Sequence, residues 1–232
     1  MSPRNSLRFL KAQLLACAIV GQMALANASE TVLVNGRSFS VETPPGVCEA
    51  SETIWGEAYH RFLLQLGAGA GGDPQILLIF SDCEFRSDPG VSRPPVRWGY
   101  LAYDANVNKY WFGQRSLNKR LSKLLGENIE GAGMARELRR LTDASLSKMR
   151  SQIKIGEILP LGKPLETDHG FLVSALTRLE NGNSYLEVYL VSVTFIRNRE
   201  ILTLTLYAPA EFKDALDDIL ASGRQFLSSL ES

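Results

Sequence analysis

Residues 170–207 read GFLVSALTRLENGNSYLEVYLVSVTFIRNREILTLTLY, and this stretch decides the fold. It holds three strand-like apolar runs, at 170–179, 185–196 and 201–207. A further run of this kind precedes it at 154–161. In chain order, Asn181-Gly182 joins the second of these four runs to the third, and Arg197-Asn198-Arg199 joins the third to the fourth. Such short links connect only antiparallel neighbours. The sequence therefore predicts a C-terminal four-strand antiparallel meander.

The run at 185–196 is apolar on both of its alternating faces. Leu186 and Val188 belong to one face, and Val191 and Val193 to the other. An antiparallel strand of this kind should be covered on both sides. One cover is predicted at 211–230, where apolar residues keep a helical period: Phe212, Leu216, Ile219, Phe226, Leu227 and Leu230.

The upstream half adds further elements. We expect a hairpin at 31–41, helices at 49–66, 116–125 and 132–153, and strands at 75–81 and 96–103. The glycines at 67–72 follow a helix and precede a strand, which is the reverse of a phosphate-binding loop, so we interpret them as a connector. The predicted fold is α/β of the α+β type, with a mainly antiparallel sheet covered by helices on both faces as an α/β/α sandwich.

The end of the chain resembles a known fold family. At 202–230 a Thr/Leu strand, Tyr207-Ala208-Pro209 and an amphipathic helix follow one another in the order found in the PsbP-like family. The resemblance implies a small α/β/α domain around an antiparallel sheet. It also implies a non-enzymatic accessory or binding role, because most members of that family have one. No functional residue is carried over by it.

Residues 1–28 have the pattern of a secretory signal peptide. Arg4, Arg8 and Lys11 precede an apolar run, and Ala26-Asn27-Ala28 has the small-x-small pattern of a cleavage site. The sequence thus predicts a periplasmic or secreted protein that begins near Ser29. We expect 29–232 to form a single globular domain.

Lipidation competes with simple export. Leu14-Leu15-Ala16-Cys17 has the residue types of a lipidation box in which Cys17 would be acylated. Only the short segment from Ala12 to Ala16 separates the last basic residue from this cysteine. A signal core usually has about 7–15 apolar residues. Simple export is favoured, and the alternative stays open.

After removal of the signal, Cys48 and Cys83 form an even pair in an exported chain. Two cysteines alone lack the spacing of a zinc site, and there is no C-x-x-C motif. A structural disulfide between them is predicted, closing a loop of about 35 residues.

Charge and motif content favour binding over catalysis. The chain has 25 basic and 25 acidic residues, and the signal removes three basic ones, so the mature net charge is −3. That balance argues against nucleic-acid binding. The only histidines, His60 and His169, offer no recognisable metal site, and no Gly-x-Ser-x-Gly motif occurs. We expect no metal, no other cofactor and no catalytic residue.

One segment combines aromatic and basic residues in the manner of an interaction surface. It consists of Trp111, Phe112, Arg115, Lys119, Arg120 and Lys123. Rings beside a basic amphipathic helix suit an anionic membrane surface. The same pattern describes an ordinary helix packed on a sheet with a solvated basic face. Trp98, Tyr100 and Tyr103 are interpreted as filling a strand face rather than stacking on a ligand.

These observations predict a non-catalytic exported protein that binds or assists others, docking on a protein partner or on the envelope surface. A protein partner is expected, and peripheral contact with a membrane surface is the second interpretation. The alternative function is a hydrolase or metal-dependent periplasmic enzyme with a dispersed site. One deep pocket with converging Asp, Glu and His side chains would favour that alternative.

Overall fold

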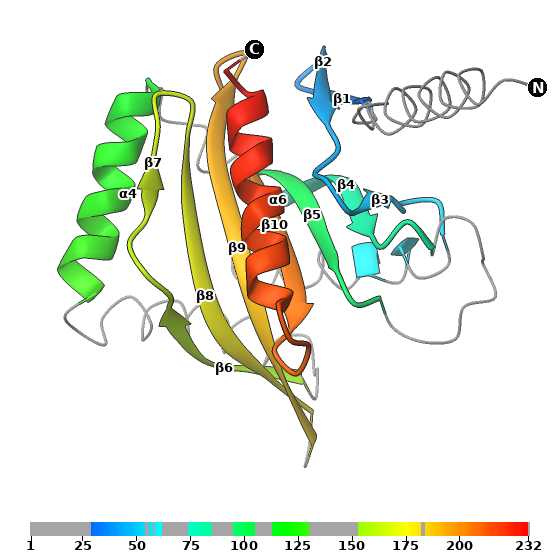
Figure 1. Ribbon diagram of the computed structural model, residues 1–232. Coiled ribbons are helices and arrows are strands. Elements are labelled where there is room, and N and C mark those ends of the chain that lie inside the picture. The colour runs from blue at the N-terminus through cyan, green and yellow to red at the C-terminus, as the bar shows by residue number, and fades with distance from the viewer. Residues whose placement is uncertain are drawn as a thin grey trace, which may run out of the picture.

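The computed structural model describes residues 29–53, 56–57, 59–61, 74–84, 95–104, 113–129, 153–181 and 184–231. The strands are β1 Ser29–Val34, β2 Arg37–Glu42, β3 Cys48–Glu49, β4 Pro74–Ser81, β5 Trp98–Asp104, β6 Ile153–Pro160, β7 Leu165–Glu166, β8 Gly170–Asn181, β9 Ser184–Arg197 and β10 Glu200–Pro209. Two long helices are described, α4 at Gln114–Ile129 and α6 at Ala215–Ser229 (Figure 1).

The main sheet is open and antiparallel. Its strands lie in the order β3-β4-β5-β10-β9-β8-β6, and β7 pairs with β8. The four C-terminal runs are neighbours, as predicted: β6 pairs with β8, β8 with β9 and β9 with β10, each antiparallel. The meander is therefore confirmed, and the chain belongs to the mixed α and β class.

The N-terminal hairpin forms a separate two-stranded sheet of β1 and β2. Asn35 and Gly36 both have positive φ, 49° and 74°, which suits the two-residue turn that the Asn-Gly pair predicts. Val32 and Val34 are buried while Leu33 between them is exposed, so one face of the hairpin joins the core. The predicted hairpin is confirmed.

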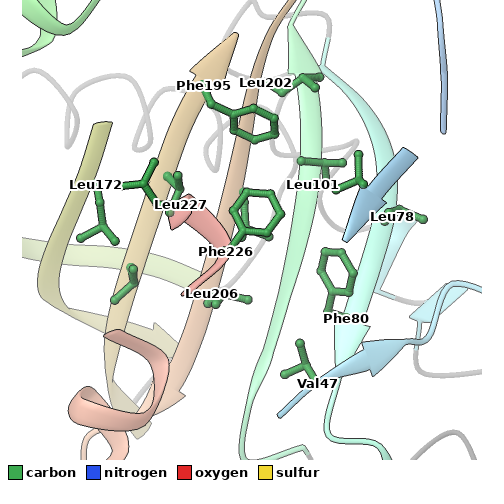
Figure 2. Close-up of a cluster of buried hydrophobic side chains, with 14 of the residues drawn as sticks. Val47, Leu78, Phe80, Leu101, Leu172, Phe195, Leu202, Leu206, Phe226 and Leu227 are labelled. Carbon is green, nitrogen blue, oxygen red and sulfur yellow. The ribbon is translucent and has the colours of Figure 1, made fainter. Parts of the chain in front are cut away.

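Helix α6 lies over one face of the main sheet and builds the core there (Figure 1). Figure 2 shows Phe226 and Leu227 of α6 among side chains from the strands and from the segment before β3. The rings of Phe195 and Phe226 lie 5.4 Å apart in an edge-to-face arrangement. A β carbon at Gly223 would lie 2.7 Å from Cγ1 of Val191, so this glycine allows the helix to approach β9 closely.

Some residues on the opposite face of the sheet are buried as well. Ile79, Phe171, Val188 and Ile201 lie in the registers that point away from α6, and all four are buried. In β9, Val188 on this face and Val193 on the α6 face are both fully buried. Leu190, Ser192 and Ile196 on the Val188 face are only half-buried, so cover of this strand on both faces stays a prediction.

Several predicted boundaries are wrong. The helix predicted from residue 49 begins later, because Cys48 and Glu49 pair with β4 as the strand β3. Gly56, Glu57 and 59–61 are helical. Helix α6 begins at Ala215 rather than at 211, since Asp214 before it has a left-handed backbone with φ 67°. Ile153, predicted to end a helix, begins β6.

Other predictions fall outside the described residues or need a correction. The rest of the predicted helix at 132–153 and the glycines at 67–72 lie outside them. Trp98 and Tyr100 share a strand face, as predicted, but Tyr103 does not. It belongs to the opposite register of β5 and is buried in the core beneath α6. Successive side chains of a strand point to opposite faces, so residue 103 lies on the face opposite to residues 98 and 100.

Candidate functional site

The predicted interaction surface is presented by α4, which lies beside β7 near one edge of the sheet (Figure 1). Side chains at the start of the helix fix it to the strands. The amide of Ile196 donates to Oε1 of Gln114 at 2.8 Å, and Nδ2 of Asn118 donates to the carbonyl of Thr167 at 2.6 Å. Leu117 and Asn118 are the buried residues in this first part of the helix. The helix therefore has a defined orientation, with a fixed inner and outer side.

The four predicted cations lie on the outer side. Arg115, Lys119, Arg120 and Lys123 are all exposed. Here the sequence prediction of a basic, solvent-facing side is confirmed. Trp111 and Phe112, the aromatic part of the prediction, lie outside the described residues.

Carboxylates of β7 and of the loop that follows it are interleaved with these cations. Nε and Nη2 of Arg115 donate to the two carboxylate oxygens of Asp168 at 3.0 and 3.2 Å. The hydrogen bond from Arg115 lowers the pKa of the Asp168 carboxyl, and both groups are fully solvated. Ser122 donates to Glu166. We call the group Arg115, Lys119, Arg120, Lys123, Glu166 and Asp168 the α4 surface. It carries mixed charge rather than a purely basic field.

A cleft of about 680 Å³ lies at the other side of the fold, beside the disulfide. The turn before β3, the end of β4, the start of β5 and the segment that enters α6 surround it. Its described lining includes Gly46, Asp82, Cys83, Arg97, Phe212 and Lys213. Cys83 is bonded to Cys48, with their Cα atoms 4.8 Å apart, so the predicted disulfide is confirmed and borders this cleft.

The carboxylate of Asp82 fixes Arg97 in the cleft. Oδ2 of Asp82 accepts the backbone amides of Val96 and Arg97 at 2.7 and 3.0 Å, and Oδ1 accepts Nε of Arg97 at 2.8 Å. The side chain of Asp82 is 14% exposed and that of Arg97 is 30% exposed. Asp82 is therefore occupied by structural hydrogen bonds, and it orients an arginine that water can still reach.

The opposite wall comes from the segment that enters α6. Phe212 is an exposed aromatic residue, 42% accessible, and Lys213 beside it is exposed. Glu84 and Asp218 add negative charge to the lining. The described lining thus combines one oriented guanidinium, one further cation, an aromatic wall and the three carboxylates of Asp82, Glu84 and Asp218.

An aromatic cluster lies on the sheet face away from α6. The rings of Trp98 and Tyr207 stack at 5.9 Å, and Tyr100 lies 6.3 Å from Tyr207 and 6.5 Å from Tyr59. Burial raises the pKa of both Tyr59 and Tyr207 well above the ordinary tyrosine value. These contacts agree with the interpretation that Trp98 and Tyr100 fill a strand face.

The surroundings of the two histidines can be followed only within the described residues. Within the described ranges, no group of three or more His, Cys, Asp and Glu side chains is placed to hold a metal ion. His169 is exposed in the turn before β8, and His60 lies in the short helical segment after β3. Over the same part of the chain, no helix has both the length and the apolar character needed to cross a membrane.

Comparison of the chain with protein-family models, curated protein sequences and solved structures finds no match. The sequence predicted the α4 cations and the disulfide but missed the cleft. Asp82 and Arg97 stand at the ends of two predicted strands, in no motif. The only usable signal was that both strand ends flank a Pro-rich connection near Cys83.

Proposed function

We propose that this chain is a non-catalytic exported protein that assists another protein by docking on it through the α4 surface. The observation that carries the proposal is that Gln114 and Asn118 hold α4 in one orientation while four cations project from its outer side. A surface that is fixed before binding loses less conformational entropy when a partner binds.

The mixed charge of this surface favours a protein partner over a membrane. Asp168 forms an ion pair with Arg115, and Glu166 accepts a hydrogen bond from Ser122 on the same side of α4. Carboxylates at these places would be repelled by an anionic lipid surface, which favours clustered cations. A folded partner can instead place its own acidic and basic groups opposite each of them.

The cleft supports a non-catalytic role. A dispersed-site enzyme would need an acid or base free to exchange protons with a substrate. Asp82, the carboxylate that orients Arg97, already accepts three hydrogen bonds, so this carboxylate is engaged in holding the fold rather than free for proton transfer. The resemblance of 202–230 to the PsbP-like family, in which accessory proteins predominate, points the same way.

The proposal also covers the arrangement of helices on both faces of the sheet and the export of the protein. Burial of Phe171 and Val188 on the sheet face away from α6 supports helices on both faces, as in an α/β/α sandwich. The signal-like residues 1–28 and the disulfide support export to the periplasm or the medium, with cleavage after Ala28.

Affinity capture with a charge-reversal variant tests the docking surface. The protein purified after export of the full chain is used as bait in envelope extracts, beside the Lys119→Glu/Arg120→Glu variant. We expect one partner to be retained by the wild type and lost with the variant. Arg224→Glu, which reverses an exposed cation on α6, is the matched control and should retain it.

A vesicle experiment separates the two kinds of surface. Co-sedimentation with anionic phosphatidylglycerol vesicles at low salt should leave the wild type in solution. Salt-sensitive binding to these vesicles, abolished by Lys119→Glu/Arg120→Glu, would assign the α4 surface to the membrane and reject the protein partner. Equal capture by the wild type, the α4 variant and Arg224→Glu would also reject it.

A further inference from the structure

We infer that the cleft beside the disulfide is a binding site for a carboxylate attached to an apolar group, held by Arg97 and by Phe212. This site is separate from the α4 surface and does not depend on the docking function.

Arg97 is fixed on two sides. Oδ1 of Asp82 accepts its Nε at 2.8 Å, while Oδ2 holds the backbone amides of Val96 and Arg97 itself. On the other side its guanidinium lies against Gly46, where even a β carbon would come within 2.3 Å of Nη1. The turn that contains Gly46 is itself fixed to α6, because Oγ of Ser222 donates to the carbonyl of Pro45 at 2.7 Å.

The outer nitrogens of this guanidinium are available for a ligand. Within the described part of the chain, Arg97 has one ion pair, through Nε, and Nη1 and Nη2 have no acceptor. A guanidinium presents its N–H groups in a planar fork that matches the two oxygens of a carboxylate. Its orientation is set before binding, so a ligand does not have to immobilise it.

The remaining lining selects the kind of anion. Asp218 adds a carboxylate to the described lining, beside the cation of Lys213. The carboxylates of Asp82 and Asp218 repel a doubly charged phosphate more strongly than a singly charged carboxylate. Phe212 offers an exposed ring, and Val96, Ala208 and Ala215 add apolar atoms to the same cleft. A ligand with one carboxylate and an adjoining apolar group therefore fits this lining best.

Such a carboxylate has two sources, the C-terminus of a polypeptide or a free organic acid. Calorimetric titration distinguishes them with four probes: acetyl-Ala-Ala-Leu with a free carboxylate, the same peptide as its C-terminal amide, hexanoate, and inorganic phosphate. We expect the free peptide to bind at about millimolar concentration, as ligands of this size do, and the amide to bind at least about tenfold more weakly. Hexanoate binding as tightly as the peptide assigns the free acid, and weaker hexanoate binding assigns the polypeptide C-terminus.

Three variants of the exported protein connect binding to the proposed residues. Arg97→Gln should weaken binding of the free peptide by about tenfold or more, because it removes the charged donor. Phe212→Ala should weaken it about three- to tenfold through lost apolar contact. Phe212 is exposed, so this variant keeps the test valid even if Arg97→Gln destabilises the fold. Lys163→Ala, an exposed cation outside the cleft lining, should bind like the wild type.

Four results would overturn the inference. They are equal binding of peptide and amide, tighter binding of phosphate than of either carboxylate, unchanged affinity in Phe212→Ala, and no heat of binding at about 10 mM of any carboxylate.

Discussion

Gly46 and Arg97 are in direct contact: a β carbon built on Gly46 would lie 2.3 Å from Nη1 of Arg97 and 3.1 Å from its Cζ. Gly46 has φ 82°, the value of the third residue of a type II turn, and the amide of Val47 closes this turn on the carbonyl of Pro44 at 3.4 Å. The glycine therefore meets two requirements, a left-handed backbone and space for a guanidinium.

The variant Gly46→Ala should destabilise the protein more than the backbone alone explains. A left-handed alanine costs about 1–2 kcal/mol, and the added methyl group must also displace Arg97. Gly162→Ala is the control, because Gly162 has φ 74° with no atom within 4 Å of a built β carbon. Urea unfolding of both variants measures the difference, and equal losses would show that the contact with Arg97 has no energetic role.

Loss of the Cys48–Cys83 disulfide should lower the free energy of unfolding by about 3–4 kcal/mol, according to the chain-entropy account of a loop this long. The bond closes a separation of 35 residues and joins β3 to the end of β4. Denaturant curves with and without reductant should differ in the wild type and coincide in Cys48→Ala/Cys83→Ala. Labelling of two thiols in the unreduced exported protein would contradict the bond.

Alkaline titration should reveal two classes of tyrosine. Burial raises the pKa of Tyr59 and Tyr207, while Tyr185 is 65% exposed. The folded state favours the neutral phenols of Tyr59 and Tyr207. Their contribution to the free energy of unfolding is therefore complete below the unfolded pKa of about 10, and it is lost as pH rises from there through their raised folded-state pKa. Absorbance at about 295 nm should show Tyr59 and Tyr207 ionising only above the ordinary tyrosine range.

The variant Tyr207→Phe identifies the buried class. It should remove one late-ionising phenol and keep the ring contacts with Trp98 and Tyr100, because phenylalanine retains the aromatic ring. Ionisation of all tyrosines in one step at the ordinary pKa, in a protein still folded by circular dichroism, would contradict the buried cluster.

The exported protein should begin at Ser29. Intact-mass measurement and N-terminal sequencing of the processed protein check this, and Ala28→Leu should block cleavage because signal peptidase needs a small residue at that place. A chain that begins at an acylated Cys17 would instead establish the lipoprotein alternative.

The local sequence determined most of the elements. Strand runs joined by Asn-Gly and Arg-Asn-Arg predicted the meander of β6, β8, β9 and β10, because short links leave only one way for neighbours to pair. The helical period after Pro209 predicted α6, and the leucines of the 116–125 segment predicted α4. Boundaries were less certain, as at Cys48–Glu49, because pairing with β4 and the bond to Cys83 decided the conformation there rather than local preference.

Functional residues divide in the same way. The cations of α4 follow from a helical period within one segment, so the sequence predicted their exposure. Tyr103 was assigned to the wrong face of β5, although the period of a strand contained that information. The cleft, by contrast, was beyond any local pattern. Asp82, Arg97 and Phe212 belong to separate elements, and no spacing along the chain connects them.

What the sequence determined by itself was therefore the strands of the meander, the helices α4 and α6, the cysteine pair and the charge of one helix face. Only the tertiary structure decided that Gly46 lies against Arg97, that Ser222 of α6 holds the turn containing that glycine, and that Phe212 faces the resulting cleft. The physical reason is the separation along the chain between the residues that interact. Periodicity and turn chemistry act between residues a few positions apart, whereas these contacts depend on how the sheet and α6 pack together.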